Sequence, residues 1–317
     1  MKKAIVGAVI SLAALWWAFR GLDWIAFKAA IAGADLFMIL VSVSFLMIGI
    51  PVRAYRWGIF LHPVHPTSLI LTSEATLVGY FGNNALPFRL GELLRTYFLQ
   101  QQIKVPFTKI LGTVIVERLI DAASLVLLVL LLPLAGVLPP EFQTPARYSV
   151  AVALLAILVL VVLTRGINKP VFRGRLGNLL ENFKAGFASL RNTRHYPILL
   201  VTSVSLWLFY LLSGYFALNA LGLGITLGQA YLVLVVGSLA IAIPATPGFV
   251  GTYHAGIILL LTSVFHLELP ASQAAAVVLH AVAFIPATLI GGIIYFKSHL
   301  RIREVKDLSW EDGPDGQ

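Results

Sequence analysis

The chain has 317 residues, of which 59% are hydrophobic and only 12% are charged, and its mean hydropathy is +0.89. A soluble domain carries roughly 25% charged residues, so this composition indicates a membrane protein. The apolar runs approach twenty residues without alternating, which predicts bundled helices rather than a β-barrel. The absence of cysteine excludes disulfides and cysteine-based metal or haem sites, and no cofactor or metal site is expected. The formal charge of +9 reports membrane topology and does not indicate nucleic-acid binding.

Apolar segments in chain order are the candidates for membrane helices. They lie near residues 4–19, 34–52, 68–82, 108–133, 147–164, 197–221, 227–244, 248–266 and 271–296. The first segment follows two lysines like a signal peptide, but it ends in bulky side chains and lacks a small-residue cleavage site. We therefore expect a retained first span, in a multi-pass protein of the plasma (inner) membrane.

Basic residues gather in four zones beside these segments. The zones hold Arg53 and Arg56, Lys104 and Lys109, the basic residues from Arg165 to Arg194, and those from Lys297 to Lys306. The positive-inside rule places all four zones in the cytoplasm. That placement is consistent only if residues 68–98 enter and leave the membrane on the cytoplasmic side. Both termini of the chain are then cytoplasmic.

Residues 68–82 are short for a membrane span. They contain the polar side chains of Thr72, Ser73, Glu74 and Thr76. We predict that this segment is the first arm of a re-entrant hairpin, which breaks at Gly82–Asn84. The chain then restarts as a helix at Pro87, because proline is favoured at the first helical position. Non-helical backbone is tolerated at membrane depth where it lines a cavity.

A second break is predicted between Ile243 and His254, where two prolines and two glycines interrupt the apolar stretch 227–266. The topology starts and ends this pair of arms outside, so its break is expected to meet the first one from the opposite side. Interrupted segments at corresponding positions of two halves point to a transporter binding site. The alternative is two full spans that are joined by an ordinary turn.

These segments predict an all-α helical bundle with a single transmembrane domain over residues 1–305. It has about six full spans plus two broken hairpins, or eight full spans plus one re-entrant hairpin, and the paired breaks suit an inverted repeat. The basic loop 165–195 has apolar residues at helical spacing, so it is either an amphipathic helix on the inner leaflet or a solvated loop. The polar tail 306–317 is expected to be disordered.

Two charged motifs lie within these apolar surroundings, where ionisable groups usually face a partner, a cavity or a substrate path. Their members are Arg89, Glu92 and Arg95 in the first motif and Glu117, Arg118 and Asp121 in the second. Residues three or four apart share one helix face. The three bases balance the three acids. The motifs therefore form either a neutral lock between the hairpin and the span that begins near Lys109, or a site for a charged substrate.

The functional interpretation rests on the helix that opens at Pro87. Its free backbone N–H groups and positive dipole end, next to Arg89, suit a phosphate or another anionic head group. Arginine binds phosphate through two parallel hydrogen bonds. Asn83 and Asn84 supply further donors and acceptors, and nearby carboxylates keep the arginines charged when no substrate is bound.

His254 and His280 are isolated in the sequence, and a lone buried histidine is usually a hydrogen-bonded core group. His254 carries more weight because it follows the second break, where it would accept a proton or touch the head group.

Three motifs in order resemble the lysylphosphatidylglycerol synthase transmembrane-region family, which includes the flippase half of the multiple peptide resistance factor. They run from Gly82 to Arg95, from Glu117 to Asp121 and from Pro244 to Gly251. The resemblance covers nearly the whole chain and implies a lipid translocase with the charged motifs near its path.

Two departures from that family bear on the substrate. This chain has His254 where the family usually has an acidic residue after its Pro-Gly-x-x-Gly element. It also ends at Gln317 without the soluble aminoacyl-transfer domain of the two-part members, so lysylphosphatidylglycerol synthesis is not expected. The lipid is then a phospholipid, a polyprenyl phosphate, a glycolipid or another anionic lipid.

The leading hypothesis is a stand-alone lipid flippase or transporter, passive or ion-coupled because the chain has no nucleotide-binding motif. The expected substrate-binding residues are Asn83, Asn84, Arg89, Glu92, Arg95, Glu117, Arg118, Asp121, Pro247, Gly248 and His254. The alternative is a non-catalytic scaffold for a lipid-modifying enzyme or glycosyltransferase. An intramembrane enzyme is less favoured, because paired Asp-rich motifs and a Gly-x-Ser-x-Gly motif are missing.

Overall fold

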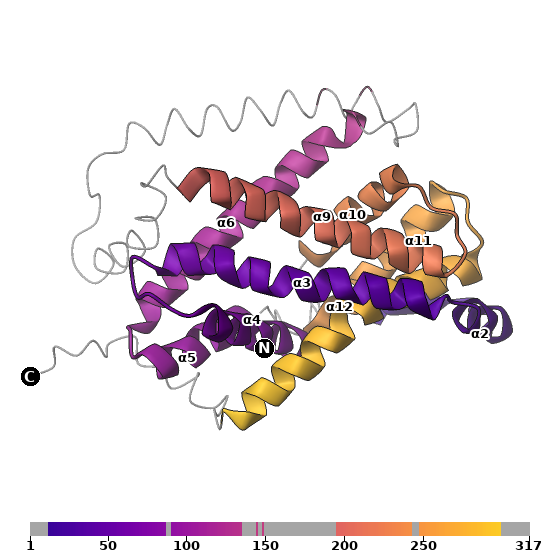
Figure 1. Ribbon diagram of the computed structural model, residues 1–317. Helices are drawn as coiled ribbons and strands as arrows, with labels where there is room; N and C mark the ends of the chain where they lie inside the picture. Colours follow the sequence, from indigo (N-terminus) through magenta and orange to yellow (C-terminus); the bar gives the residue numbers. More distant parts are fainter. Residues whose placement is uncertain are drawn as a thin grey trace, which may run out of the picture.

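The computed structural model describes residues 12–86, 90–134, 195–242 and 247–298, together with residues 144 and 148. Within these ranges every regular element is a helix (Figure 1). The helices are α2 (Trp24–Ala32), α3 (Leu36–Leu61), α4 (Leu69–Ala85), α5 (Gly91–Ile103), α6 (Phe107–Leu131), α9 (Tyr196–Ala220), α10 (Leu227–Ala242), α11 (Thr252–Ser263) and α12 (Leu269–Lys297), with short 3-10 turns η2 (Leu132–Leu134) and η5 (Pro247–Phe249). The expected all-α bundle is confirmed.

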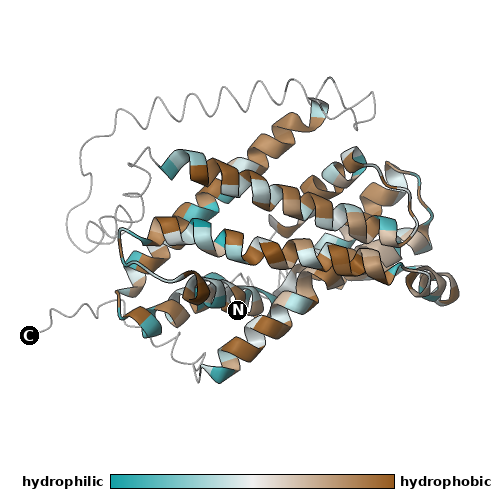
Figure 2. Cartoon of the chain, in the orientation of Figure 1, coloured by the Kyte–Doolittle hydropathy of each residue, from teal (hydrophilic) through white to brown (hydrophobic). Residues whose placement is uncertain are grey.

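Three of these helices, α3, α9 and α12, are long and apolar enough to cross a membrane. Figure 2 shows their predominantly hydrophobic surfaces. The helix α6 has 25 residues and carries the second charged motif. The number of spans and the side of the termini stay predictions. The predicted span 147–164 except residue 148, the loop 165–195 except residue 195, and the tail 306–317 lie outside the described residues.

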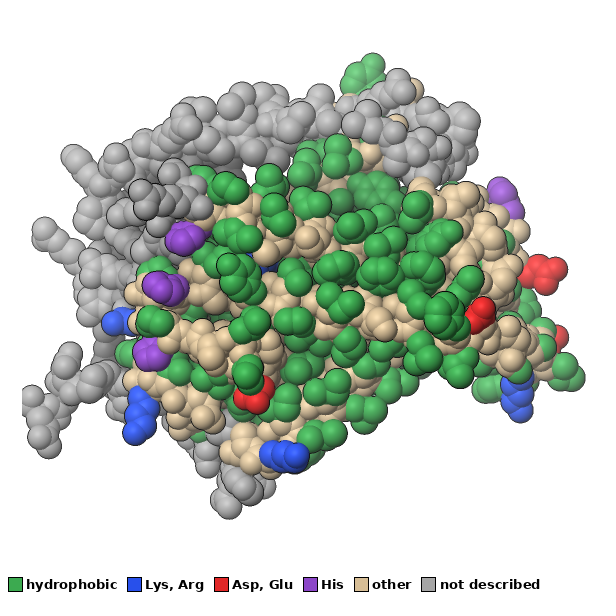
Figure 3. Space-filling view, viewed as in Figure 1, with side chains coloured by type: hydrophobic (Ala, Val, Ile, Leu, Met, Phe, Trp, Pro, Cys, Tyr) green, Lys and Arg blue, Asp and Glu red, His purple; other side chains and the backbone are tan. Residues whose placement is uncertain are grey.

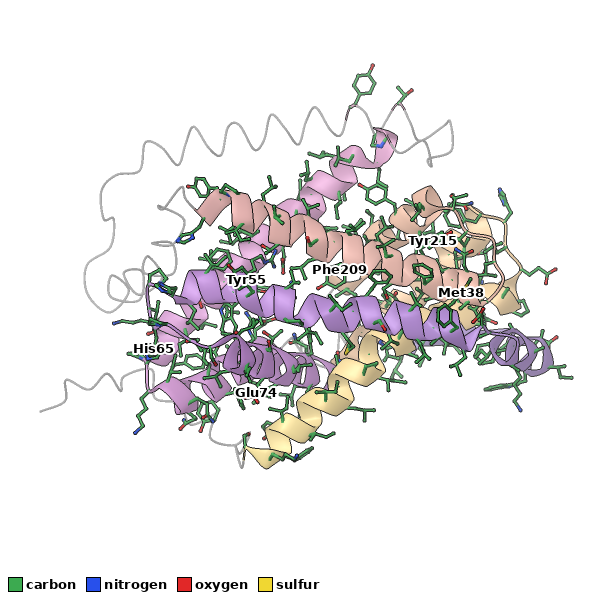
Figure 4. All side chains as sticks on the ribbon, viewed as in Figure 1. Met38, Tyr55, His65, Glu74, Phe209 and Tyr215 are labelled. Carbon is green, nitrogen blue, oxygen red and sulfur yellow. The ribbon has the colours of Figure 1, made fainter. Side chains whose placement is uncertain are left out.

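The helices α3 and α9 form an antiparallel pair along the length of the bundle. The Ser42 hydroxyl donates to the Ser213 carbonyl at 2.7 Å near one end, whereas Arg56 bonds to Ser203 near the other. Figure 4 labels Met38 near the start of α3, His65 beyond its end and Phe209 on α9. The pair gives the bundle a long axis, along which the positions of the hairpins can be compared.

The helices α4 and α5 form the predicted first hairpin. They run antiparallel, because Gly79 packs on Arg95 while Gly82 packs on Gly91. A Cβ atom at Gly91 would overlap the Gly79 carbonyl oxygen, so the glycines permit this close approach. With 17 and 13 residues, both arms are shorter than the roughly 20 residues of a membrane-spanning helix.

The predicted break at Gly82–Asn84 is wrong, because α4 continues through Ala85. Its last turn is intact: the Leu86 N–H donates to the Gly82 carbonyl at 2.8 Å. Asparagine usually weakens a helix by hydrogen bonding to nearby backbone. Here the Asn83 and Asn84 amides reach partners on α5 and α12 instead. The reversal therefore falls after Ala85, and α5 is described from Gly91, while the predicted helix start at Pro87 lies outside the described residues.

The second hairpin consists of α10 and α11, and the predicted interruption between them is confirmed. Gly248 and Gly251 have φ angles of 67° and 100°, which end regular helix there, and α11 begins at Thr252. The arms have 16 and 12 residues. They pack antiparallel, with Gly256 against Ala240 and Gly237 against Tyr253. Short arms with a broken tip favour a hairpin over two full spans.

The two hairpins enter the bundle from opposite ends, and their tips meet, as the sequence predicted. The arms α4 and α5 connect to α3 and α6 at the end where α3 stops. The arms α10 and α11 connect to α9 and α12 at the end where α3 starts. A Cβ atom on Gly248 would lie 3.6 Å from the Asn84 carbonyl oxygen. The meeting point lies between the two ends of the bundle (Figure 1).

Exposed charges differ between the two ends. Lys104 and Lys109 lie where α3 stops, whereas the other end carries the acids Asp23, Asp35 and Glu268 together with the bases Arg20 and Lys28. Asp23 and Asp35 accept backbone hydrogen bonds as the N-caps of α2 and α3. Figure 3 shows a broad hydrophobic face between these ends, as expected for a surface in contact with lipid.

Candidate functional site

The charged motifs meet in one cluster, and the cluster includes two arginines that the sequence interpretation placed elsewhere. The sequence predicts that Arg53 and Arg56 belong to a cytoplasmic basic zone, but both lie inside α3 and are buried. Each forms an ion pair with Asp121 of α6. The sequence predicts an apolar run that ends near residue 52, whereas α3 continues past Pro51 to Leu61 and carries both guanidinium groups against α6. Arg53 and Arg56 therefore do not indicate which side of the membrane this end of α3 faces.

Glu117 lies at the centre of this cluster, and its side chain is fully buried. Its Oε1 atom lies 3.3 Å from Arg53 Nε, 3.7 Å from Arg56 Nη2 and 3.6 Å from Arg118 Nη2. Its Oε2 atom pairs with Arg95 of α5. One carboxylate thus joins four guanidinium groups from three helices, which compensates part of its desolvation cost.

Glu92 of α5 forms the outer part of the cluster. Its Oε1 atom lies 3.2 Å from Arg118 Nη2 and accepts a hydrogen bond of 3.3 Å from the Asn83 amide. Its Oε2 atom lies 3.6 Å from Arg95 Nε, and Arg118 Nη1 in turn donates to Asp121 at 3.2 Å. The pairs of residues three apart, Glu92 with Arg95 and Arg118 with Asp121, are thus in contact. Arg89 lies outside the described residues.

Three neutral side chains contact the arginines of the cluster. The Arg95 guanidinium lies over the Trp57 ring at 4.1 Å, and the Trp57 indole N–H donates to Thr113 at 2.9 Å. Arg53 donates to the Tyr80 hydroxyl at 3.2 Å and Arg56 to the Ser203 hydroxyl at 3.0 Å. These contacts extend the cluster to α4 and α9. Because five helices converge there, it positions helices as well as charges.

The predicted balance of charge is wrong for the described residues. Four guanidinium groups, from Arg53, Arg56, Arg95 and Arg118, face the three carboxylates of Glu92, Glu117 and Asp121. The cluster therefore carries one excess positive charge. Low dielectric makes such an excess costly unless an anion or water compensates it.

Exposure is concentrated at one edge of the cluster. The side chains of Arg56, Arg95 and Glu117 are at most 2% exposed, and that of Arg53 is 8% exposed. The more accessible side chains are Asp121 at 17%, Glu92 at 18% and Arg118 at 30%. The Nε atoms of all four arginines are buried without a hydrogen-bond partner among the described residues, so exposure alone distinguishes Arg118. Arg118 is thus the guanidinium that an outside ligand reaches most directly.

The other expected residues lie where the hairpin tips meet. The Asn84 amide donates to Thr288 Oγ1 of α12 at 2.7 Å, while the Asn84 backbone borders Gly248. Pro247 is the first residue of η5. Asn83 connects this region with the charged cluster, because it is next to Asn84 in α4 and donates to Glu92.

His254 and His280 are not isolated, in contrast to their interpretation from sequence. Their ring centroids lie 4.8 Å apart in an edge-to-face arrangement. His280 Nε2 lies 2.9 Å from the Gly248 carbonyl oxygen. The rings come from α11 and α12, and only the packing of the second hairpin on α12 brings them together.

The sequence pattern of the lysylphosphatidylglycerol synthase transmembrane region matches residues 4–291. The chain belongs to this family. It is 26% identical over 224 residues to a UPF0104 membrane protein of Methanocaldococcus jannaschii, a match that covers 68% of this chain and 93% of the relative. It is 25% identical over 340 residues to a UPF0104 membrane protein of Pyrococcus horikoshii, which covers 94% of this chain and 98% of the relative.

A third relative is the glycosyltransferase AglD of Haloferax volcanii. The identity is 22% over 308 residues, which covers 84% of this chain but 49% of the glycosyltransferase. Family membership and the apolar helices establish a membrane protein.

Proposed function

We propose that this protein translocates lipids with anionic head groups between the two leaflets of the membrane. The observation that carries the proposal is the excess of one guanidinium group in a buried cluster whose accessible edge contains Arg118. An anionic head group at this edge would neutralise the excess. Membership of a family that is named for the transmembrane region of a lipid synthase supports a lipid substrate.

Arginine suits this task because its planar guanidinium donates two parallel hydrogen bonds to a phosphate group. The two terminal nitrogens of Arg118 contact Glu92, Glu117 and Asp121, and its Nε atom is buried without a hydrogen-bond partner among the described residues. We infer that the head group replaces part of this carboxylate shell when it binds. Glu92, Glu117 and Asp121 would then keep the arginines charged between binding events, which avoids an uncompensated buried charge.

The hairpin tips would form the inner part of the lipid path. Broken or short helices that meet near the middle of a bundle place polar backbone where a substrate can reach it. Asn83 connects Glu92 to the tip of the first hairpin, and Asn84 borders Gly248 of the second. A head group that leaves the cluster would therefore meet polar groups at the tips before it meets hydrocarbon.

We further propose the plasma (inner) membrane as the location, with the His62, Lys104 and Lys109 end in the cytoplasm. This orientation rests on exposed Lys104 and Lys109, because positive residues favour the cytoplasmic side. The opposite end, where Asp23, Asp35 and Glu268 outnumber the bases Arg20 and Lys28, would face outward.

The test is leaflet exchange of fluorescent lipids by the purified protein in proteoliposomes. Labelled phosphatidylglycerol, a polyprenyl phosphate and the zwitterionic phosphatidylethanolamine are compared under identical conditions, with empty liposomes as the reference. The proposal predicts protein-dependent exchange of at least one anionic lipid above that of phosphatidylethanolamine. Exchange of no anionic lipid above the empty-liposome rate would reject it.

A second candidate function is a non-catalytic membrane partner of a lipid-modifying enzyme or glycosyltransferase. It is favoured by the relation to AglD, of which this chain matches about half. The many ion pairs between α3, α5 and α6 would then serve only to fix the helices. This alternative predicts that the purified protein exchanges no lipid, and that an enzyme copurifies with it.

A further inference from the structure

The histidine pair at the second hairpin tip differs chemically from the charged cluster. His254 is 5% exposed, and its Nδ1 atom has no hydrogen-bond partner among the described residues. Nothing in the ion-pair cluster contacts it in those residues. It is therefore a buried basic group that the proposed binding of a head group at Arg118 does not use.

The hydrogen bond at His280 defines how the pair can accept a proton. A carbonyl oxygen only accepts, so the contact of 2.9 Å with Gly248 assigns the His280 proton to Nε2. The Nδ1 atom of the neutral ring is then the acceptor. Binding of a proton at Nδ1 turns the ring into an imidazolium that still donates to Gly248. The tip contact is thus compatible with the charged form.

The surroundings of the two rings are mainly aromatic. Phe19 lies 5.7 Å from His254 and Phe284 lies 5.1 Å from His280, measured between ring centroids. Tyr253 contacts both rings, at 6.0 and 5.7 Å. Among the described residues no carboxylate and no further basic side chain pairs with either ring. A proton on the pair would therefore carry an uncompensated charge.

The proximity of the two imidazoles limits the pair to one proton. Two imidazolium rings with centroids 4.8 Å apart would repel strongly in a low dielectric. One proton alone is costly for burial, but an anion beside the pair would offset that cost. Gly248, which accepts the hydrogen bond from His280, borders Asn84 on the tip of the first hairpin. An anionic head group at the meeting tips would lie close enough to supply this compensation.

We propose that His254 and His280 form a single-proton site that is filled when an anionic lipid head group reaches the hairpin tips, so that one proton accompanies each lipid. The proton comes from water on the side where the lipid enters, binds an imidazole nitrogen and returns to water on the other side. No bond of the lipid changes. The transmembrane proton gradient would then drive net lipid movement. This inference rests on the proposed function.

The first experiment measures proton uptake on lipid binding, without transport. Dioctanoyl phosphatidylglycerol is titrated into the detergent-purified protein by calorimetry, in buffers with different ionisation enthalpies across pH 5–8. Wild type should take up close to one proton per bound lipid in part of this range, as expected for one coupled site. His254→Gln and His280→Gln should still bind lipid but lose most of the uptake. His62→Gln, in an exposed position at the end of α3, is the matched control and should resemble wild type.

The second experiment measures lipid exchange in proteoliposomes with and without an imposed pH difference. Wild-type exchange should become directional with the gradient, and its rate should fall about tenfold per pH unit on the alkaline side of the site, as a single-proton requirement dictates. His254→Gln and His280→Gln should lose this dependence on pH, whereas His62→Gln should keep it.

The outcomes separate this inference from the proposed function. Lipid exchange that is indifferent to pH, together with binding that takes up no proton, would overturn the single-proton site and leave translocation standing. Absence of both exchange and binding for the anionic lipids would overturn translocation and the proton site together. Proton uptake that His254→Gln and His280→Gln retain would reject the assignment to this pair.

Discussion

Arg56 of α3 and Asp121 of α6 form an ion pair in which the arginine side chain is completely buried. The same carboxylate also pairs with Arg53 and receives a hydrogen bond from Arg118. Three guanidinium groups therefore depend on one aspartate. Because α3 and α6 are separated by the first hairpin in sequence, this pairing positions the hairpin as well as the charges.

Replacement of Asp121 should destabilise the protein more than most single substitutions. Asp121→Asn removes one of the two carboxylates that Arg53 and Arg56 share, and breaking a buried ion pair costs about 3 kcal/mol or more. The measurement is the free energy of unfolding in detergent micelles. Asp35→Asn is the control, because Asp35 is an exposed N-cap that asparagine replaces well. Equal stability of the two variants would show that the ion pairs of Asp121 do not stabilise the fold.

The arginines should differ according to their exposure. Arg95→Gln removes a buried guanidinium that pairs with Glu117 and lies over Trp57, so we expect a loss of about 3 kcal/mol. Arg118→Gln removes a partly exposed side chain, so the loss should be smaller than that of Arg95→Gln. Thermal unfolding of the two purified variants in the same detergent measures both losses of stability. A larger loss for Arg118→Gln would contradict the assignment of Arg118 to the accessible edge.

The first hairpin should not tolerate a side chain at Gly91. In Gly91→Ala the new Cβ atom overlaps the Gly79 carbonyl oxygen. We expect the free energy of unfolding to fall by about 1–3 kcal/mol, the usual cost of placing an extra carbon atom in a packed core. Gly58→Ala is the matched control, since a Cβ atom there has open space within helix α3. That change should be neutral, or stabilising by up to about 1 kcal/mol. Comparable stability of both variants would show that α4 and α5 are not closely packed.

The connection between the first hairpin tip and α12 should appear as an energetic coupling. Asn84→Ala and Thr288→Val each remove one partner of the hydrogen bond between these side chains. A double-mutant cycle should give a coupling of about 1 kcal/mol in unfolding free energy. The pair of Asn84→Ala with Ser73→Ala is the control, because the Ser73 hydroxyl bonds within its own helix. A coupling near zero for Asn84 and Thr288 would mean that the tip is held by other contacts.

Much of the architecture was predictable because it depends on local pattern. Long apolar runs gave α3, α9 and α12, and the clustered prolines and glycines before His254 gave the second break. The prediction that the two tips meet followed from topology and is confirmed by the contact between Asn84 and Gly248. The first break was misplaced, because the tertiary partners of Asn83 and Asn84 keep α4 helical beyond them.

The composition of the charged cluster was only partly predictable. Spacing predicted the faces shared by Glu92 with Arg95 and by Asp121 with Arg118. Arg53 and Arg56 were missed, because arginines after a proline near the end of an apolar run resemble markers of a cytoplasmic loop. Their spacing of three, with Trp57 and Phe60 beside them, was the available sign of a continuing helix. Whether such an arginine is buried is decided by the distant Asp121, which no local pattern contains.

The most direct test of the account compares wild type, Arg118→Gln and Lys109→Gln in the leaflet-exchange assay with labelled phosphatidylglycerol. Both variants remove one positive charge from α6, but Lys109 is exposed at its start and lies outside the cluster. We predict that Arg118→Gln lowers the exchange rate about tenfold or more, which corresponds to a lost charge-assisted hydrogen bond of roughly 1.5 kcal/mol. Lys109→Gln should exchange like wild type. Equal rates for all three folded proteins would contradict a head-group site at the cluster.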